Sequence, residues 1–228
     1  MSPICRAFST MFIAIPLVAC VPGEQKSVKE VEKLYQLNPN PQKAYKLTVQ
    51  IKDAPGPMKF MGGSIEYLAN NCSFLTNNIE GVTSTPRKHV DLQFRTAAKD
   101  TYETVIYLDG MKDEDYFGDG ICHWESTGFG VGFSATGKLE ETGFSVPTSL
   151  FGEDSILNTG TKTMYYWKGG YPYFKQKNGL PARPSETDPN KQRDNVIYDG
   201  EKSKDAFPDN QKNDLFSITL TLEELKND

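Results

Sequence analysis

The sequence predicts a mainly β protein: a single antiparallel β-sandwich, or barrel-like, domain with long loops that follows a short N-terminal tether. From residue 43 onward, apolar residues alternate with polar ones in short runs. Gly, Pro, Asn and Asp separate these runs, as in turns between strands. Helical spacing is clear only in the tether. About seven or eight such strands are typical of an antiparallel sandwich or barrel, so we expect one domain over residues 43–228.

The strands differ in how strongly the alternation marks them. Residues 45–51 and 215–222 alternate cleanly between apolar and polar side chains, so each predicts a strand with one buried face. A short helix is expected at residues 222–226. Residues 175–214 are long, charged and rich in Pro, Asn and Asp, which indicates a loop excursion that is either a solvated connection or a binding loop. The remaining expected strands lie at residues 63–74, 90–94, 102–108, 122–135, 143–146 and 161–167.

The N-terminal segment has the pattern of an export signal. Arg6 precedes an apolar run over residues 7–21, which ends in the sequence Leu-Val-Ala-Cys at Cys20. This sequence resembles the lipobox of bacterial lipoproteins, which implies cleavage before Cys20 and acylation of that cysteine. The run is about 15 residues long and contains Pro16, so it is too short to span a bilayer comfortably. The alternative is an ordinary secretory signal with a chance cysteine.

These features predict a signal peptide over residues 1–19 and a lipidated tether over residues 20–42. We therefore expect a periplasmic location with attachment to a membrane through the lipid. Val21 follows Cys20, where an aspartate would favour the inner membrane, so the outer membrane is expected. Within the tether, Ser27 and Glu30 form a capping-box pattern before residues of helical spacing. Either a short helix or a flexible spacer fits this segment.

The charge balance excludes several classes of partner. Removing residues 1–19 takes away one charged residue, Arg6, so the net charge of −5 becomes −6. Nucleic-acid binding needs a basic face that neutralises phosphates, so this acidic balance argues against it. Attachment to anionic lipid by charge is disfavoured for the same reason, so the acyl chains must provide the anchoring.

The cysteines predict one disulfide bond. Cys5 leaves with the signal and Cys20 carries the lipid, so Cys72 and Cys122 remain. They would pair in an oxidising periplasm. Closing a loop of about 50 residues would stabilise the fold by roughly 4 kcal/mol. The alternative is a reactive thiol at Cys122 with His123 as its base, although adjacent residues of a strand point to opposite faces.

Motifs for catalysis are missing from the mature sequence. It contains neither a Gly-x-Ser-x-Gly elbow nor a Ser-x-x-Lys dyad. His89 and His123 are its two histidines, so acid–base catalysis and zinc binding have few candidates. We expect His123 to be structural and His89 to be solvated. We therefore expect no catalytic residues, no cofactor and no metal centre, while a Ser–His–Asp triad stays open until the fold is known.

An acidic segment between residues 109 and 120 is the first candidate binding site. Asp113, Asp115 and Gly118 fit three positions of a calcium-binding loop. Two further ligand positions are occupied by Phe117 and Trp124, so the standard calcium pattern fails, and a non-standard calcium site stays open as an alternative. The segment is then a solvated hairpin end or a patch in which charges surround aromatic anchors for a protein partner. The candidate contact residues are Asp113, Glu114, Asp115, Tyr116 and Phe117.

A cluster of aromatic residues between positions 165 and 174 is the second candidate. A strand over residues 161–167 would bury alternate rings, whereas the sequence after Gly170 is typical of a turn and cannot bury every ring. Exposed rings of this kind serve as hot spots for a protein or as stacking platforms for a sugar. The candidate residues are Tyr171, Tyr173 and Phe174.

Several stretches together resemble one bacterial family. They are the lipobox, residues 44–49 with 53–57, residues 113–118 with 122–125, and residues 166–172. They are similar to lipoproteins encoded beside phospholipase effectors of the type VI secretion system, which serve as immunity proteins. The resemblance implies an anchored periplasmic protein, without catalytic residues, that binds the incoming phospholipase. It would block the active site or the membrane-binding face of that enzyme.

The residues themselves are compatible with other roles as well. A non-catalytic envelope lipoprotein that binds cell-wall glycan, or an envelope assembly partner, would have the same anchor and aromatic residues. An envelope hydrolase with an unrecognised site is a third hypothesis, in which His89 or His123 would be essential. The choice of immunity among these roles depends on the resemblance.

Overall fold

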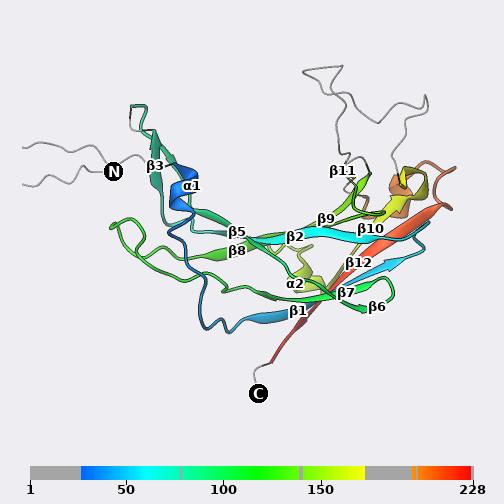
Figure 1. The fold of residues 1–228 in the computed structure, drawn as a ribbon, viewed down its shortest axis with the longest axis horizontal. Helices are drawn as coiled ribbons and strands as arrows, with labels where there is room; N and C mark the ends of the chain where they lie inside the picture. Colours follow the sequence, from blue (N-terminus) through cyan, green and yellow to red (C-terminus); the bar gives the residue numbers. More distant parts are fainter. Residues whose placement is uncertain (1–26, 78, 139–140, 173–196, 199, 227–228) are drawn as a thin grey trace, which may run out of the picture. The chain divides into compact units, whose positions relative to one another are not determined.

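The computed structural model describes residues 27–77, 79–138, 141–172, 197–198 and 200–226, and Figure 1 shows its fold. The chain is mainly β with antiparallel sheets, as predicted. It divides into two compact units. The smaller comprises the described residues up to Leu37 with Leu68–Lys88 and Met111–Trp124, and the larger comprises the rest. The sequence predicted one domain because the smaller unit consists of three short segments, none long enough to indicate a domain.

The described strands of the larger unit form two five-stranded sheets. The first sheet consists, in spatial order, of β10 (Thr161–Trp167), β12 (Leu215–Glu224), β1 (Ala44–Lys52), β7 (Thr101–Tyr107) and β6 (Arg95–Ala98). The second consists of β11 (Ile197–Tyr198), β9 (Gly143–Ser149), β8 (Glu125–Ser134), β2 (Lys59–Leu68) and β5 (Arg87–Asp91). The predicted sandwich is thereby confirmed, and these sheets do not close into a barrel.

Aromatic side chains between the two sheets form the core of the larger unit. Phe144 on β9 meets Tyr166 on β10 and Phe216 on β12 edge to face, with ring centroids 5.5 and 5.0 Å apart. The Tyr166 hydroxyl donates a hydrogen bond of 2.6 Å to the Ser145 carbonyl. All three rings are buried. Such pairs add stabilisation beyond the burial of their apolar area.

The smaller unit contains a short helix, a hairpin and a disulfide-closed loop. Helix α1 (Val28–Val31) has the expected capping box, in which Ser27 and Glu30 bond to each other's backbone N–H. Strands β3 (Phe74–Asn77) and β4 (Val82–Ser84) form the hairpin. Buried residues are few, and they include Val31, Tyr35, Ala69, Phe74, Met111, Cys122 and Trp124.

Several predicted element boundaries were wrong. The expected strand at residues 63–74 is two strands, β2 and β3, which belong to different units. The expected helix at residues 222–226 is the end of β12, because Leu222 continues the ladder with Leu47 on β1. Helix α2 (Ile156–Thr159) was not predicted.

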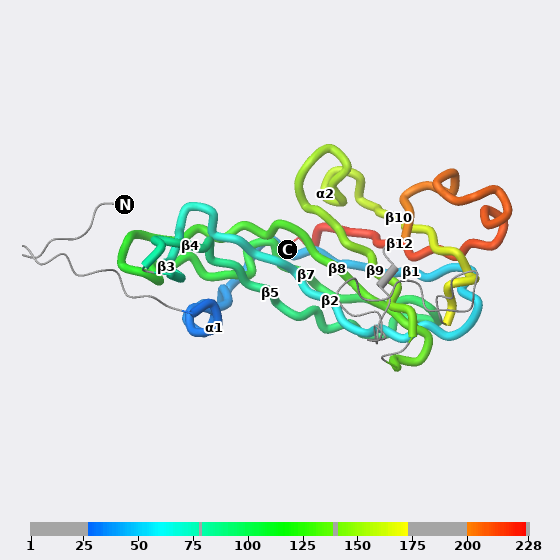
Figure 2. The backbone as a smooth tube through the Cα atoms, turned by 90° about the horizontal axis from the view of Figure 1, so that it is seen from above, coloured from blue at the N-terminus to red at the C-terminus, as the bar shows by residue number. Residues whose placement is uncertain are grey.

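Most of the expected loop excursion lies outside the described residues. Its described part contains β11 and the 3₁₀ turn η2 (Lys204–Ala206). Residues 200–214, orange in Figure 2, lie beside β10 and β12, and the Lys168 N–H donates to the Asp214 carbonyl at 3.0 Å. A second 3₁₀ turn, η1 (Lys168–Gly170), follows β10.

In the part of the chain that the structure describes, no helix has the length and apolar character needed to cross a membrane. The predicted signal peptide, Cys20 and residues 21–26 of the tether lie outside that part.

Candidate functional site

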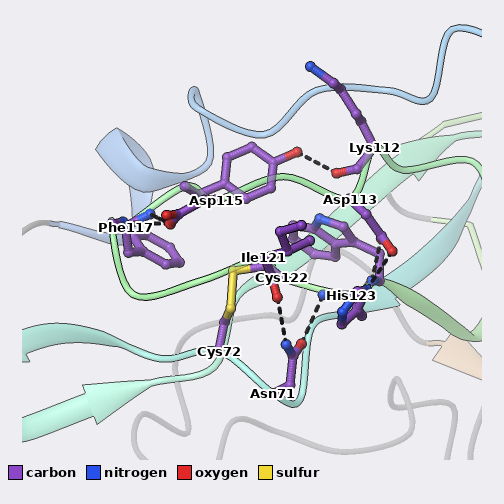
Figure 3. The surroundings of a disulfide bond; sticks show 12 residues. Asn71, Cys72, Lys112, Asp113, Asp115, Phe117, Ile121, Cys122 and His123 are labelled. Carbon is purple, nitrogen blue, oxygen red and sulfur yellow. Dashed lines mark hydrogen bonds and ion pairs between the residues drawn. A yellow bond between two sulfur atoms is a disulfide. The ribbon is translucent and has the colours of Figure 1, made fainter.

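The disulfide-closed loop of the smaller unit is shown in Figure 3. Cys72 and Cys122 are bonded, with an S–S distance of 2.05 Å and a Cα–Cα distance of 5.5 Å, as the sequence predicted. With its sulfur in this bond, Cys122 has no thiol for His123 to activate. The side chain of Asn71 reinforces the closure: its Nδ2 donates to the Ile121 carbonyl at 2.8 Å, and its Oδ1 accepts the His123 N–H at 2.9 Å.

Asp113 bonds to two residues, His123 and Trp124, that follow the disulfide-bonded Cys122. Its Oδ2 lies 2.7 Å from Nδ1 of His123, and its Oδ1 accepts the Trp124 N–H at 2.9 Å. The His123 side chain is 66% exposed. Sequence reasoning did not predict this pair, because nine residues of irregular backbone lie between its members. Through these two bonds Asp113 ties residues 123 and 124 to the start of the acidic segment.

The two aromatic candidates of this loop pack inside the smaller unit. Tyr116 lies edge-on to Tyr35 at 5.4 Å, and Phe117 stacks on Phe74 at 5.7 Å. The Tyr116 hydroxyl donates to the Lys112 carbonyl at 2.6 Å. Both rings are half-buried. They therefore hold the loop in place, and any contact with a partner would use only their exposed edges.

The acidic candidates differ in their exposure and in the partners that their carboxylates have. Asp113 and Asp115 are exposed. One oxygen of Asp115, Oδ1, accepts the N–H groups of Phe117 and Gly118, so its carboxylate has a fixed direction. Glu114 is half-buried and pairs with Lys112 at 3.1 Å. The loop thus presents Asp113 and Asp115 in set positions.

Several apolar side chains of the smaller unit are exposed. Ile79, in the turn of the β3–β4 hairpin, is 93% exposed, and Ile121, in the disulfide-closed loop, is 55% exposed. Sequence reasoning did not select either residue, because single isoleucines in turns carry no pattern. Apolar side chains that remain exposed beside charges are characteristic of interaction surfaces. The others in this unit are Val28, Leu34, Leu37 and Val82.

The aromatic candidates after β10 are only partly described. Tyr171 is half-buried, its hydroxyl donates to the Pro57 carbonyl at 2.8 Å, and its ring stacks on Phe144. Burial, and next the charge of Glu141, raise the pKa of Tyr171. A Cβ at Gly56 would collide with the Tyr171 hydroxyl, so a larger residue there would require the Tyr171 ring to shift. Tyr173 and Phe174 lie outside the described residues.

A groove of about 940 Å³ lies on the larger unit, over strands β2, β5, β8 and β9. At one side of it, Glu66 Oε2 lies 3.5 Å from His89 Nε2, and the Thr127 hydroxyl donates to Glu66 Oε1 at 2.6 Å. His89 is on β5 and its side chain is about half exposed, in line with the solvated position expected. Sequence reasoning missed the groove because alternating glycines and apolar residues look like any strand with one buried face.

Among the described residues, no group of three or more His, Cys, Asp and Glu side chains is arranged to hold a metal ion. Comparisons of the chain with protein-family models, with curated proteins and with solved structures found no match.

Proposed function

We propose that this chain is a periplasmic, lipid-anchored binding protein that neutralises a type VI secretion phospholipase effector and so acts as an immunity protein. The signal pattern and the family resemblance support export, anchoring and this class of target. The observation that carries the binding role is the disulfide-closed loop. It holds two exposed carboxylates in fixed directions beside an exposed isoleucine.

The fixed geometry favours binding for two reasons. A loop that is already ordered loses less conformational entropy when it meets a partner, so more of the contact energy appears as affinity. Asp113 and Asp115 would also attract a basic partner surface over several ångströms and speed the encounter. Enzymes that work on anionic phospholipid surfaces bind them with basic and apolar residues. An acidic loop with an exposed isoleucine is complementary to such a face.

The experiment titrates the purified mature protein against the phospholipase encoded beside it and measures phospholipid hydrolysis. We expect full inhibition near one equivalent. The double variant Asp113→Asn/Asp115→Asn keeps the oxygens that accept backbone N–H groups but removes two charges, so inhibition should weaken about tenfold or more. The control Glu153→Gln/Asp154→Asn removes the same charge from exposed positions of the larger unit and should inhibit like wild type.

Unchanged hydrolysis at a stoichiometric excess of wild-type protein would contradict the proposed function. Absence of a neighbouring lipase gene would count against it as well. If the two double variants inhibit equally, the inhibitory surface lies elsewhere than the acidic loop, while the immunity role remains.

The alternative role, binding of cell-wall glycan or of an assembly partner, draws on the aromatic residues after β10. Of these, Tyr171 has its hydroxyl bonded to Pro57 and its ring against Phe144. A ring held in this way offers less free surface for stacking on a sugar. Retention on peptidoglycan that is lost in a Tyr171→Ala/Tyr173→Ala variant would favour the alternative.

A further inference from the structure

Two glycines of β8 are not required by the packing or the backbone conformation of the described fold. Gly130 and Gly132 lie in the interior of a strand that pairs with β9 on one side and β2 on the other. Neither has a positive φ. A Cβ added at Gly130 would come no closer than 4.0 Å to Val146 O, and one at Gly132 no closer than 3.7 Å to Gly62 O. These are ordinary van der Waals distances, so alanine would fit at both positions.

Two other glycines nearby behave differently and provide a comparison. A Cβ at Gly128 would lie 2.6 Å from Thr148 O, and one at Gly63 would lie 2.7 Å from Gly130 O. Backbone atoms cannot move aside easily, so these two positions require glycine. A glycine inside a strand otherwise weakens the strand, and often marks a place where a ligand approaches the backbone closely. Gly130 and Gly132 fit that second explanation.

The unexplained glycines form the floor of the groove. Phe129, Val131 and Phe133 of β8 are buried between the sheets, so Gly130 and Gly132 face the opposite side. The neighbouring floor positions on β9 and β2 are also small or short, namely Ser145, Pro147, Ser149 and Ser64. Larger side chains on β8 would fill this space.

The walls of the groove carry polar and charged groups of both signs. Asp91 on β5 is exposed at one side, and Lys138 lies beyond the end of β8. Ser134 also lines the groove, is only 3% exposed, and has a buried hydroxyl oxygen without a hydrogen-bond partner among the described residues. An unpaired buried hydroxyl is costly, and a bound ligand could pair it.

The residues that line the groove favour a polypeptide over a sugar or an acyl chain. The phenylalanines that border the groove are buried, so none of the described lining residues offers the exposed aromatic face that stacks on a sugar. An acyl chain would leave the Ser134 hydroxyl unpaired. A polypeptide presents N–H and C=O groups at short intervals together with side chains of both charges. The backbone of β8 is already paired on both edges, so a bound peptide would lie across the sheet face rather than extend it.

We propose that this groove binds an extended segment of a partner polypeptide, with a basic side chain beside Asp91 and an acidic side chain beside Lys138. The complementary charges set the orientation of the segment, and the glycine floor admits its backbone. The groove lies on the larger unit and the test uses no phospholipase, so this inference is independent of the immunity role.

The first experiment measures thermal stability. Gly130→Ala and Gly132→Ala should each raise the melting temperature by about 1–4 °C, because alanine strengthens a strand where it fits. Gly128→Ala should lower it, because of the clash with Thr148 O. If Gly130→Ala and Gly132→Ala both destabilise the protein, these glycines serve the fold and the inference is overturned.

The second experiment measures binding with a defined probe, a phage library of random linear heptapeptides. Seven extended residues span about 23 Å, enough to cross four strands. Peptides selected on the mature wild-type protein should bind the Gly130→Val/Gly132→Val variant at least tenfold more weakly. They should bind Gln50→Val, which adds a valine to an exposed position of the other sheet, like wild type. Asp91→Asn should reduce the enrichment of Lys and Arg among selected peptides.

Three further outcomes would overturn the inference. The first is equal binding of the selected peptides to wild type and to the double valine variant. The second is failure to enrich any peptide beyond what the double valine variant enriches. The third is that soluble cell-wall glycan fragments or a fatty acid bind in place of peptides and that the double valine variant loses this binding.

Discussion

The two units of the molecule are stabilised in different ways. In the larger unit, long strands bury alternate side chains between two sheets, and rings such as Phe144 and Phe216 fill the space. The smaller unit has short elements and few buried residues, and it depends on a disulfide and on side chain–backbone hydrogen bonds. Small cores contribute little stability, so small units need such cross-links. The difference teaches that the proposed binding loop owes its order to specific bonds and a few ring contacts rather than to a large buried core.

The largest expected effect comes from removing the disulfide. Cys72→Ser/Cys122→Ser should lower the free energy of unfolding of the smaller unit by up to about 4 kcal/mol. The larger unit should change much less. The two tryptophans allow the units to be followed separately, because Trp124 lies in the smaller unit and Trp167 on β10 of the larger. The free energy of unfolding is measured by denaturant titration in Trp124→Phe and Trp167→Phe variants, in each of which the remaining tryptophan reports on one unit. If removing the disulfide lowers the free energy of unfolding equally in both variants, the units unfold as one.

A smaller effect is expected for a buried carboxylate of the larger unit. Glu141 is 3% exposed and accepts hydrogen bonds from Thr136, Gly137 and Lys138. Burial raises the pKa of Glu141, but these bonds outweigh burial and lower it to about 2. Because the folded-state pKa lies below that of the unfolded chain, the stabilisation is present above about pH 5 and is lost as the pH falls towards 2.

Glu141→Gln should therefore cost about 1–3 kcal/mol at neutral pH, the usual value of hydrogen bonds to a charged group. Its stability should also fall less than that of wild type between pH 5 and pH 2. Trp167 fluorescence during urea unfolding at several pH values measures both quantities. A wild-type protein and a variant with parallel pH profiles would show that Glu141 titrates normally.

The smallest effect is expected for the two hydrogen bonds that the Asn71 side chain makes beside the disulfide. Asn71→Ala removes the hydrogen bonds to Ile121 and His123, and should destabilise the smaller unit by about 1 kcal/mol because the site is exposed. The same Trp124 signal detects this change. In the absence of the disulfide the effect of Asn71→Ala should be smaller, since the loop is then already loose. If Asn71→Ala costs as much stability without the disulfide as with it, the Asn71 hydrogen bonds act independently of the disulfide.

The sequence predicted the fold where one face of a strand is buried and the other is not. Residues 45–51, 161–167 and 215–222 alternate because they belong to the sandwich, and the structure places strands there. Residues 68–73 misled the prediction, because Ala69 continues the alternation of Ile65 and Tyr67 in β2 but belongs to the smaller unit. Alternation reports burial and cannot tell in which unit the residue is buried.

The candidate sites were predictable only in part. Elimination among four cysteines was sufficient for the Cys72–Cys122 bond. The contact between Asp113 and His123 depends on the path of an irregular loop, which no local pattern encodes. Gly130 and Gly132 were visible in the sequence, but a glycine that the fold requires and one that it does not require look alike until their neighbours are known.

The disulfide has a topological consequence as well. It joins two excursions of the chain, so residues 72–122 form a covalent ring that includes β5, β6 and β7 of the sandwich. A protease that cut the exposed turn at Ile79 would open this ring without separating the chain into two pieces. In an oxidising compartment that contains proteases, one cleavage would leave a nicked but undivided protein.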